Sequence, residues 1–194
     1  VTEDAAPLDD VVLERSRERT AEEIAESYKG FLTPRPPKTV GFVLDGPPAE
    51  GDPVDRYAAE IMEVAGKSFD IRFVRKAADQ TVAGVDAALH EMLADPGVDL
   101  VITTGTLGSF RALRAGAPPK PVIAGMLLEP AVAGLTLSKD GGSGVKNLAC
   151  AAFEGVVPRD LARFRELSPF KRVAVLVDAR LAEAAPETFL TVLH

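Results

Sequence analysis

The sequence predicts an α/β fold: a doubly wound parallel sheet forming one Rossmann-like lobe, with a second lobe only begun. Short apolar segments alternate with helical segments of about 10–15 residues, which is the pattern of repeated βαβ units. Turns rich in glycine and proline separate these segments. Of the 194 residues, 46% are hydrophobic and 26% are charged, so the chain can fill one packed core.

Residues 1–37 are predicted to be a charged helical segment followed by a proline-rich linker. Glutamates recur at every fourth position, which places them on one solvated helix face; they are Glu14, Glu18, Glu22 and Glu26. The prolines that follow end any helix, because proline lacks the amide donor and disfavours the α conformation in the residue before it. A domain is therefore expected to begin at residue 38.

Residues 38–157 are predicted to form the first ligand-binding lobe. Residues 39–44 read as a buried strand, residues 69–74 as an edge strand with one wetter face, and residues 98–103 as a central strand. The other expected elements are helices over 54–66 and 81–94, a short helix ending at Arg114, and strands over 121–125, 135–137 and 145–153. Right-handed crossovers predict the order 2-1-3-4 for the first four strands.

Residues 158–194 are predicted to be a connector and the first βα unit of a second lobe. A helix over 158–167 is followed by an apolar strand over 172–178 and by a helix from about Leu181. One βα unit leaves a sheet face uncovered, so exposed apolar surface and a homodimer, formed by pairing or by swapping, are expected.

The composition argues against several classes of function. The net charge is −7 and the 22 basic residues are scattered, so neither nucleic acid nor an anionic membrane is an expected partner. Cys150 stands in an apolar run and is expected to pack as a small buried side chain. His90 and His194 lack partners at metal-ligand spacing, so no metal and no other cofactor is predicted.

The candidate ligand-binding residues follow from the positions of the loops. In an open parallel sheet, ligands bind beyond the carboxyl ends of the strands, where the strand order reverses. The candidates selected by that rule are Asp45, Gly46, Thr104, Gly105, Thr106, Glu129 and Asn147. A nucleotide site is not favoured, because the glycine-rich residues 140–148 lack the spacing of a phosphate-binding loop.

Each of these candidates also has a structural alternative. Gly105 and Thr106 lead from a strand into a helix, so free amides there suit an anionic or polar group, but a tight turn with a helix cap has the same sequence. Asp45 offers a carboxylate or caps a turn. Glu129 is the one acid in an apolar segment and is expected to need a polar or cationic partner.

The order of segments resembles a known family. The segments are the strand over 40–44, residues 98–106 ending in Gly-Thr, residues 121–123 leading to Glu129-Pro130, the run 142–147, and the passage 164–178. From about residue 38 to 180 this order resembles the ABC-type substrate-binding proteins related to the tryptophan/tyrosine-type binders. Two departures, Glu129 in place of a commoner Asp and Lys146-Asn147 in place of an Asn-x-Thr-Gly turn, leave the ligand open.

The resemblance implies a type I periplasmic-binding-protein fold, in which two lobes close on a small polar ligand such as an amino acid. It also implies a periplasmic or extracytoplasmic location, with a membrane permease or an envelope complex as partner, and no catalysis. The chain starts with Val1, which is compatible with a removed leader that carries a lipid anchor. Some relatives serve efflux or secretion, so import is less firmly implied than binding.

Binding is therefore expected rather than an enzymatic activity. No serine or cysteine has a histidine placed to activate it, so covalent hydrolysis is not predicted. Two alternatives stay open: a small α/β enzyme acting on a sugar or nucleotide, and an envelope-associated sensory or interaction module that uses the charged first 32 residues.

Overall fold

The computed structural model describes residues 20–23, 26, 34–48, 51, 53–139, 141–174 and 176–184. The chain divides into two compact units, Val1–Pro36 and Pro37–His194. In the first unit, Thr20 and Glu23 form a reciprocal helix cap: each backbone amide donates to the other side chain, over 3.0 and 3.2 Å. Of the four predicted surface glutamates, Glu22 and Glu26 are exposed and helical, and the other two lie outside the described residues.

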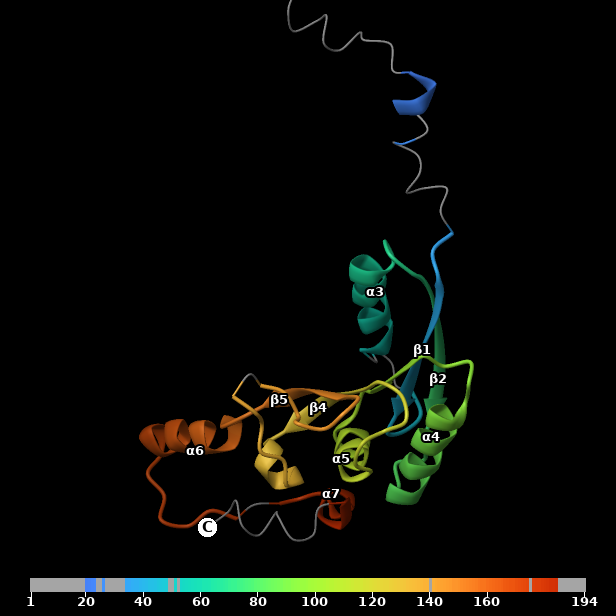
Figure 1. Ribbon diagram of the computed structural model, residues 1–194. Coiled ribbons are helices and arrows are strands. Elements are labelled where there is room, and N and C mark those ends of the chain that lie inside the picture. The colour runs from blue at the N-terminus through green and yellow to red at the C-terminus, as the bar shows by residue number, and fades with distance from the viewer. Residues whose placement is uncertain are drawn as a thin grey trace, which may run out of the picture. The chain divides into compact units, whose positions relative to one another are not determined.

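The second unit is built on a five-stranded sheet in which all neighbouring strands are parallel (Figure 1). Its strands are β1 (Pro37–Leu44), β2 (Asp70–Ala77), β3 (Leu100–Thr103), β4 (Val122–Leu128) and β5 (Leu148–Phe153). The order β2-β1-β3-β4-β5 confirms the predicted doubly wound fold and the predicted order of the first four strands. β2 lies at one edge, and its exposed and half-buried side chains largely alternate, as its sequence predicts.

Helices cover both faces of the sheet. α3 (Val54–Ala65) packs on one face of the sheet, where Phe42 and Ile102 belong to the hydrophobic core between the helix and the sheet. α4 (Val82–Ala94) and α5 (Thr106–Arg114) pack on the other face, over Val43 and Val101. Because successive side chains of a strand point to opposite faces, Phe42 and Val43 enter different cores.

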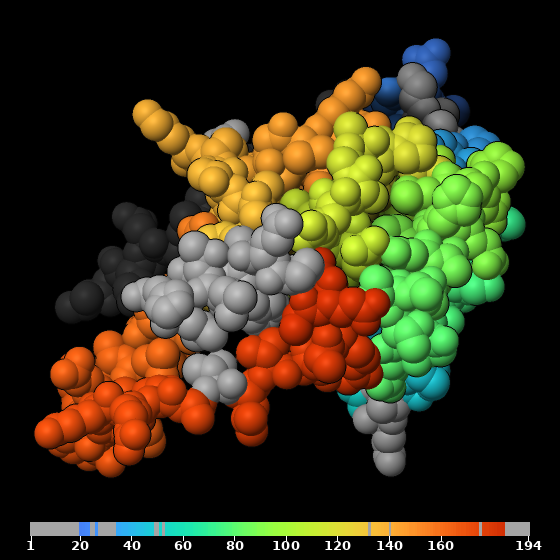
Figure 2. All heavy atoms as spheres, turned by 90° about the horizontal axis from the view of Figure 1, so that it is seen from below, coloured from blue at the N-terminus to red at the C-terminus, as the bar shows by residue number. Residues whose placement is uncertain are grey.

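Two helices follow β5. α6 (Val156–Leu167) has no buried side chain. α7 (Ala179–Ala184) packs against α4 and α5, where Ala184 joins Val85 and Leu107 in one buried cluster. In Figure 2 the red atoms of α7 lie against the green atoms of α4, whereas the orange atoms of α6 lie apart from them.

Some predicted boundaries and elements differ from the structure. The predicted strand over 172–178 is wrong: its described residues are irregular, since a strand needs a partner strand and the described sheet ends at β5. Residues 135–137 are also irregular, after the short 3₁₀ helix η1 (Pro130–Ala133). β4 continues to Leu128, three residues past its predicted end, and β5 begins at Leu148 rather than at 145. Residues 185–194, predicted to be helical, lie outside the described residues.

Candidate functional site

A cavity of about 380 Å³ opens at the carboxyl ends of β1 and β3. β1 leads to α3 on one face of the sheet and β3 leads to α5 on the other, so this is the point where the strand order reverses. Four of the predicted residues line the cavity: Asp45, Gly46, Thr104 and Thr106. Three polar residues that were not predicted also line it: Gln80, Asp178 and Arg180.

Asp45 is the central charged group of the cavity. It follows β1 directly, and its carboxylate accepts hydrogen bonds from the backbone amides of Leu107 (2.9 Å) and Gly108 (2.8 Å). These amides belong to the first turn of α5, where free donors and the helix dipole favour a negative charge. A side chain that directly follows β1 therefore caps a helix that follows β3.

Gly105 makes this close approach possible. A Cβ atom at position 105 would lie 2.1 Å from Asp45 Oδ2, which is well inside van der Waals contact. Any larger residue there would push the carboxylate away from the α5 amides. The predicted Gly-Thr junction thus has a specific function in the fold, which is to admit the Asp45 side chain.

The surroundings of Asp45 act on its pKa in opposite directions. Burial is the largest effect and raises the pKa above the ordinary value of 3.8. The amides of Gly108 and Leu107 and the positive charge of Arg180 oppose that rise by favouring the ionised form. Asp45 is thus a half-buried carboxylate whose net pKa is raised, as is common at binding sites.

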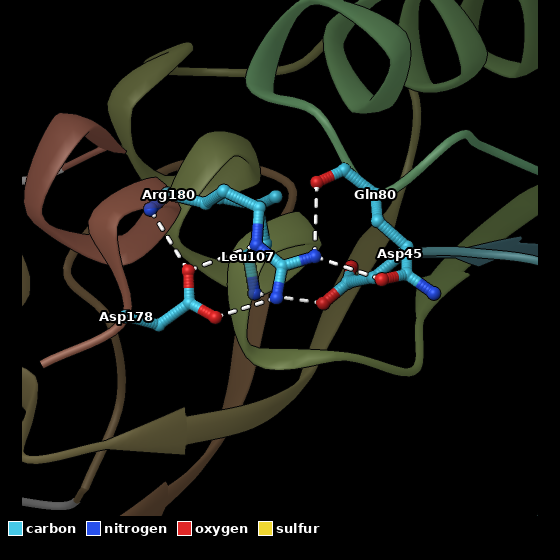
Figure 3. Close-up of polar contacts among 5 residues, drawn as sticks. All are labelled: Asp45, Gln80, Leu107, Asp178 and Arg180. Atoms are coloured by element: carbon cyan, nitrogen blue, oxygen red, sulfur yellow. Dashed lines mark hydrogen bonds and ion pairs between the residues drawn. The ribbon is translucent and has the colours of Figure 1, made fainter.

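Arg180 of α7 lines the same cavity as Asp45 (Figure 3). Its Nη1 donates to Gln80 Oε1 over 2.8 Å, and its Nε donates to Asp178 Oδ1 over 2.8 Å. Its Nη2 donates to the other Asp178 oxygen, so each guanidinium nitrogen has a partner. The hydrogen bond from Arg180 lowers the pKa of Asp178 to about 2.

Gln80 connects this cluster to Asp45. Its backbone amide donates to the carbonyl oxygen of Asp45 over 2.7 Å, and its φ of 65° lies in the left-handed region, which non-glycine residues rarely adopt. One signal could have found Gln80: it follows β2, the strand that pairs with β1, so it must lie beside Asp45. No sequence signal places Asp178 and Arg180 here, because their position depends on how α7 packs.

The structure does not bring the other two predicted residues to the cavity. Glu129 follows β4 and caps α6, accepting from the amides of Gly155 (3.1 Å) and Val157 (2.9 Å). Its expected polar partner is therefore a helix N-terminus. Asn147 precedes β5, so it lies at the opposite edge of the sheet from Asp45, where its Nδ2 donates to the Pro118 carbonyl oxygen over 3.1 Å.

Other side chains with chemical potential are placed outside the cavity. Cys150 is half-buried, and burial is the main cause of its raised pKa, which fits packing rather than reactivity. His90 is exposed on α4, and His194 lies outside the described residues. Over the described ranges, no three His, Cys, Asp or Glu residues come together as metal ligands.

The cavity lining suits binding of a polar molecule. It combines one partly buried carboxylate, an amide side chain, two threonines and a guanidinium already paired with a carboxylate. Within the part of the chain that the structure describes, no helix is long and apolar enough to cross a membrane. Comparisons of this chain with protein-family models, with curated proteins and with solved structures find no match.

Proposed function

We propose that this chain contains a solute-binding lobe that takes a small polar molecule into the cavity at Asp45. The observation that carries the proposal is the position of the Asp45 carboxylate, half-buried in a cavity at the switch point of a doubly wound sheet. The volume of about 380 Å³ fits a small molecule, because ligand pockets measure roughly 300–1,000 Å³.

The wider role that we propose is that of an extracytoplasmic substrate-binding protein of an ABC-type transport system, with a membrane permease as partner. Its support is the order of sequence segments that resembles that family, together with the doubly wound fold. A small α/β enzyme acting on a sugar or nucleotide is the alternative. It has less support, because Asp45 is a candidate base but the described lining residues include no histidine, cysteine, serine or lysine to act with it.

A thermal-shift screen tests the binding proposal. Amino acids, sugars and nucleobases are each added to the full chain, and a ligand of the native state is expected to raise the apparent Tm. The Gly105→Val variant should lose that shift, since its side chain displaces the Asp45 carboxylate. Gly97→Val is the control, because Gly97 is exposed, has no left-handed φ, and a Cβ there would meet only the Asp95 carboxylate, at 3.1 Å. The absence of any shift for all three solute classes would contradict the proposal.

We also propose that this chain forms homodimers. The support is apolar surface at its C-terminal end: Leu167 of α6 is 85% exposed and Leu176 is 98% exposed. Light scattering on the full chain tests this point, with a dimer mass expected for the wild type and a lower association constant for Leu167→Glu combined with Leu176→Glu. A monomer at all concentrations up to those of crystallisation would contradict it.

A further inference from the structure

The Arg180 side chain lines the cavity beside Asp45. It comes from α7, far along the chain from Asp45, and its positive charge acts directly on the Asp45 carboxylate. Figure 3 shows its side chain between Asp178 and Gln80, with Asp45 beside Gln80. The side chains of Arg180 and Asp178 are 45% and 39% exposed, so this arrangement sits at the mouth of the cavity and not in the core.

The charges of the lining favour a cation. Asp45 and Asp178 carry two negative charges and Arg180 one positive charge, which leaves one negative charge among the lining residues. Asp178 neutralises Arg180 by a two-bond contact, so the negative charge that is left is that of Asp45. The cavity therefore has a site for a positive group beside Asp45.

An anionic group has no equivalent place. The first-turn amides of α5 would attract an anion, but the Asp45 carboxylate already accepts from Leu107 and Gly108. Four of the five N–H donors of Arg180 are used by Asp178 and Gln80, so it could offer a ligand carboxylate one donor but not a two-bond contact. Asp45 thus fills the position that a bound anion takes at other helix N-termini.

We propose that the cavity binds a small molecule through a guanidinium group, and that this group displaces the Arg180 guanidinium from its place beside Asp45. Gln80 Oε1, which Arg180 now contacts, is the second acceptor for the incoming cation. Arg180 can leave together with Asp178, because the two are only two residues apart and their pair is exposed to solvent. This inference rests on the proposed binding function and adds the charge class of the ligand.

Arginine and citrulline are a matched pair of probes for this inference. They have nearly the same size and shape, but the side chain of arginine ends in a cation and that of citrulline ends in a neutral urea group. Isothermal titration of the full chain at neutral pH is expected to give a Kd for arginine at least about tenfold lower than for citrulline or glutamate. Equal affinity for arginine and citrulline, or tighter binding of glutamate, would overturn the charge class.

The displacement is tested with Arg180→Gln. Removal of the internal cation is expected to lower the Kd for arginine about three- to tenfold, because the ligand no longer competes with Arg180. Arg159→Gln on α6 is the control: it removes the same charge from an exposed pair outside the cavity and should leave the Kd unchanged. A higher Kd in Arg180→Gln, with Tm and circular dichroism preserved, would show that Arg180 holds the ligand and would overturn displacement.

The two proposals fail in different ways. If an uncharged solute from the thermal-shift screen binds in an Asp45-dependent manner and the cations do not, the charge class is wrong and the binding function stands. If no solute of any charge binds, both are contradicted.

Discussion

The sheet has an amino edge, where its strands begin, and a carboxyl edge, where its strands end. These two edges use charged side chains in different ways. At the amino edge, the Lys120 ammonium donates to three backbone carbonyl oxygens, those of Met92, Asp95 and Val98. An ammonium has three donors, so this group is satisfied entirely within the chain. At the carboxyl edge, Asp45 accepts two amide hydrogen bonds, but a carboxylate has about four acceptor positions. Its remaining capacity faces a cavity.

An acid at the amino edge, Asp99, also differs from Asp45. Asp99 accepts from Lys38 Nζ and from the Thr39 amide, each over 2.8 Å, and these contacts lower its pKa. They join the start of β1 to the turn before β3. The pKa of Asp45 is instead raised, because burial outweighs its partners. Asp99 and Asp45 each accept two hydrogen bonds, but one donor to Asp99 is the Lys38 ammonium, whereas both donors to Asp45 are backbone amides, so the Asp45 charge is available to a cationic ligand.

The largest effect on stability is expected from Lys120→Met. The substitution leaves up to three carbonyl oxygens without their donor, and the free energy of unfolding should fall by about 1–3 kcal/mol. Urea denaturation measures this loss. Lys139→Met, at an exposed position, is the control and should change the free energy of unfolding by less than about 0.5 kcal/mol. Ligand affinity should stay the same in both variants. Equal stability of the two would break the comparison between the edges.

Asp45→Asn is expected to differ from Lys120→Met mainly in its effect on ligand binding. Asparagine has one acceptor oxygen for the two α5 amides, so one of them loses its partner, which is partly offset because the cost of burying a charge disappears; the unfolding free energy should fall by at most about 1–2 kcal/mol. The affinity for arginine should nevertheless fall about tenfold or more, since the charge that attracts the cation is gone. Asp86→Asn removes a carboxylate paired with Arg111 outside the cavity and is the matched control. Unchanged arginine affinity in Asp45→Asn would argue against the site.

A smaller effect on arginine affinity is expected from a lower pH. Arginine binding needs ionised Asp45, whose pKa lies above 3.8, so affinity should fall as the pH drops from 7 towards 4. Asp178 and Arg180 are the other charged groups of the cavity, and Asp178, with a pKa of about 2, stays ionised throughout this range. The folded protein binds the Asp45 proton more tightly than the unfolded chain, so the same acidification should relieve, not increase, the cost of burying this group. Titration calorimetry at several pH values measures the decline, which Asp45→Asn should lack.

The sequence predicted most of the sheet and part of the site. Apolar periodicity identified β1, β2 and β3, and the rule for carboxyl ends selected Asp45, Gly46 and the residues around Gly105. The rule misplaced Asn147, because the left-handed turn at that residue comes before β5 and so lies at the other edge. Asp178 and Arg180 could not be predicted, since the apolar sequence of 172–178 favours a strand and only the packing of α7 brings them to Asp45.

The central claim is that a ligand binds at Asp45, and amide chemical shifts test it most directly. In a ¹H–¹⁵N spectrum of the full chain titrated with arginine, the amides of Leu107 and Gly108 should move, because both donate to the carboxylate that the ligand contacts. The amide of Thr39, which donates to Asp99 at the amino edge, is the internal reference and should stay in place. Saturable shifts at Leu107 and Gly108, with Thr39 unmoved, are the predicted result. Shifts centred on Thr39, or saturable binding that leaves Leu107 and Gly108 unmoved, would contradict the account.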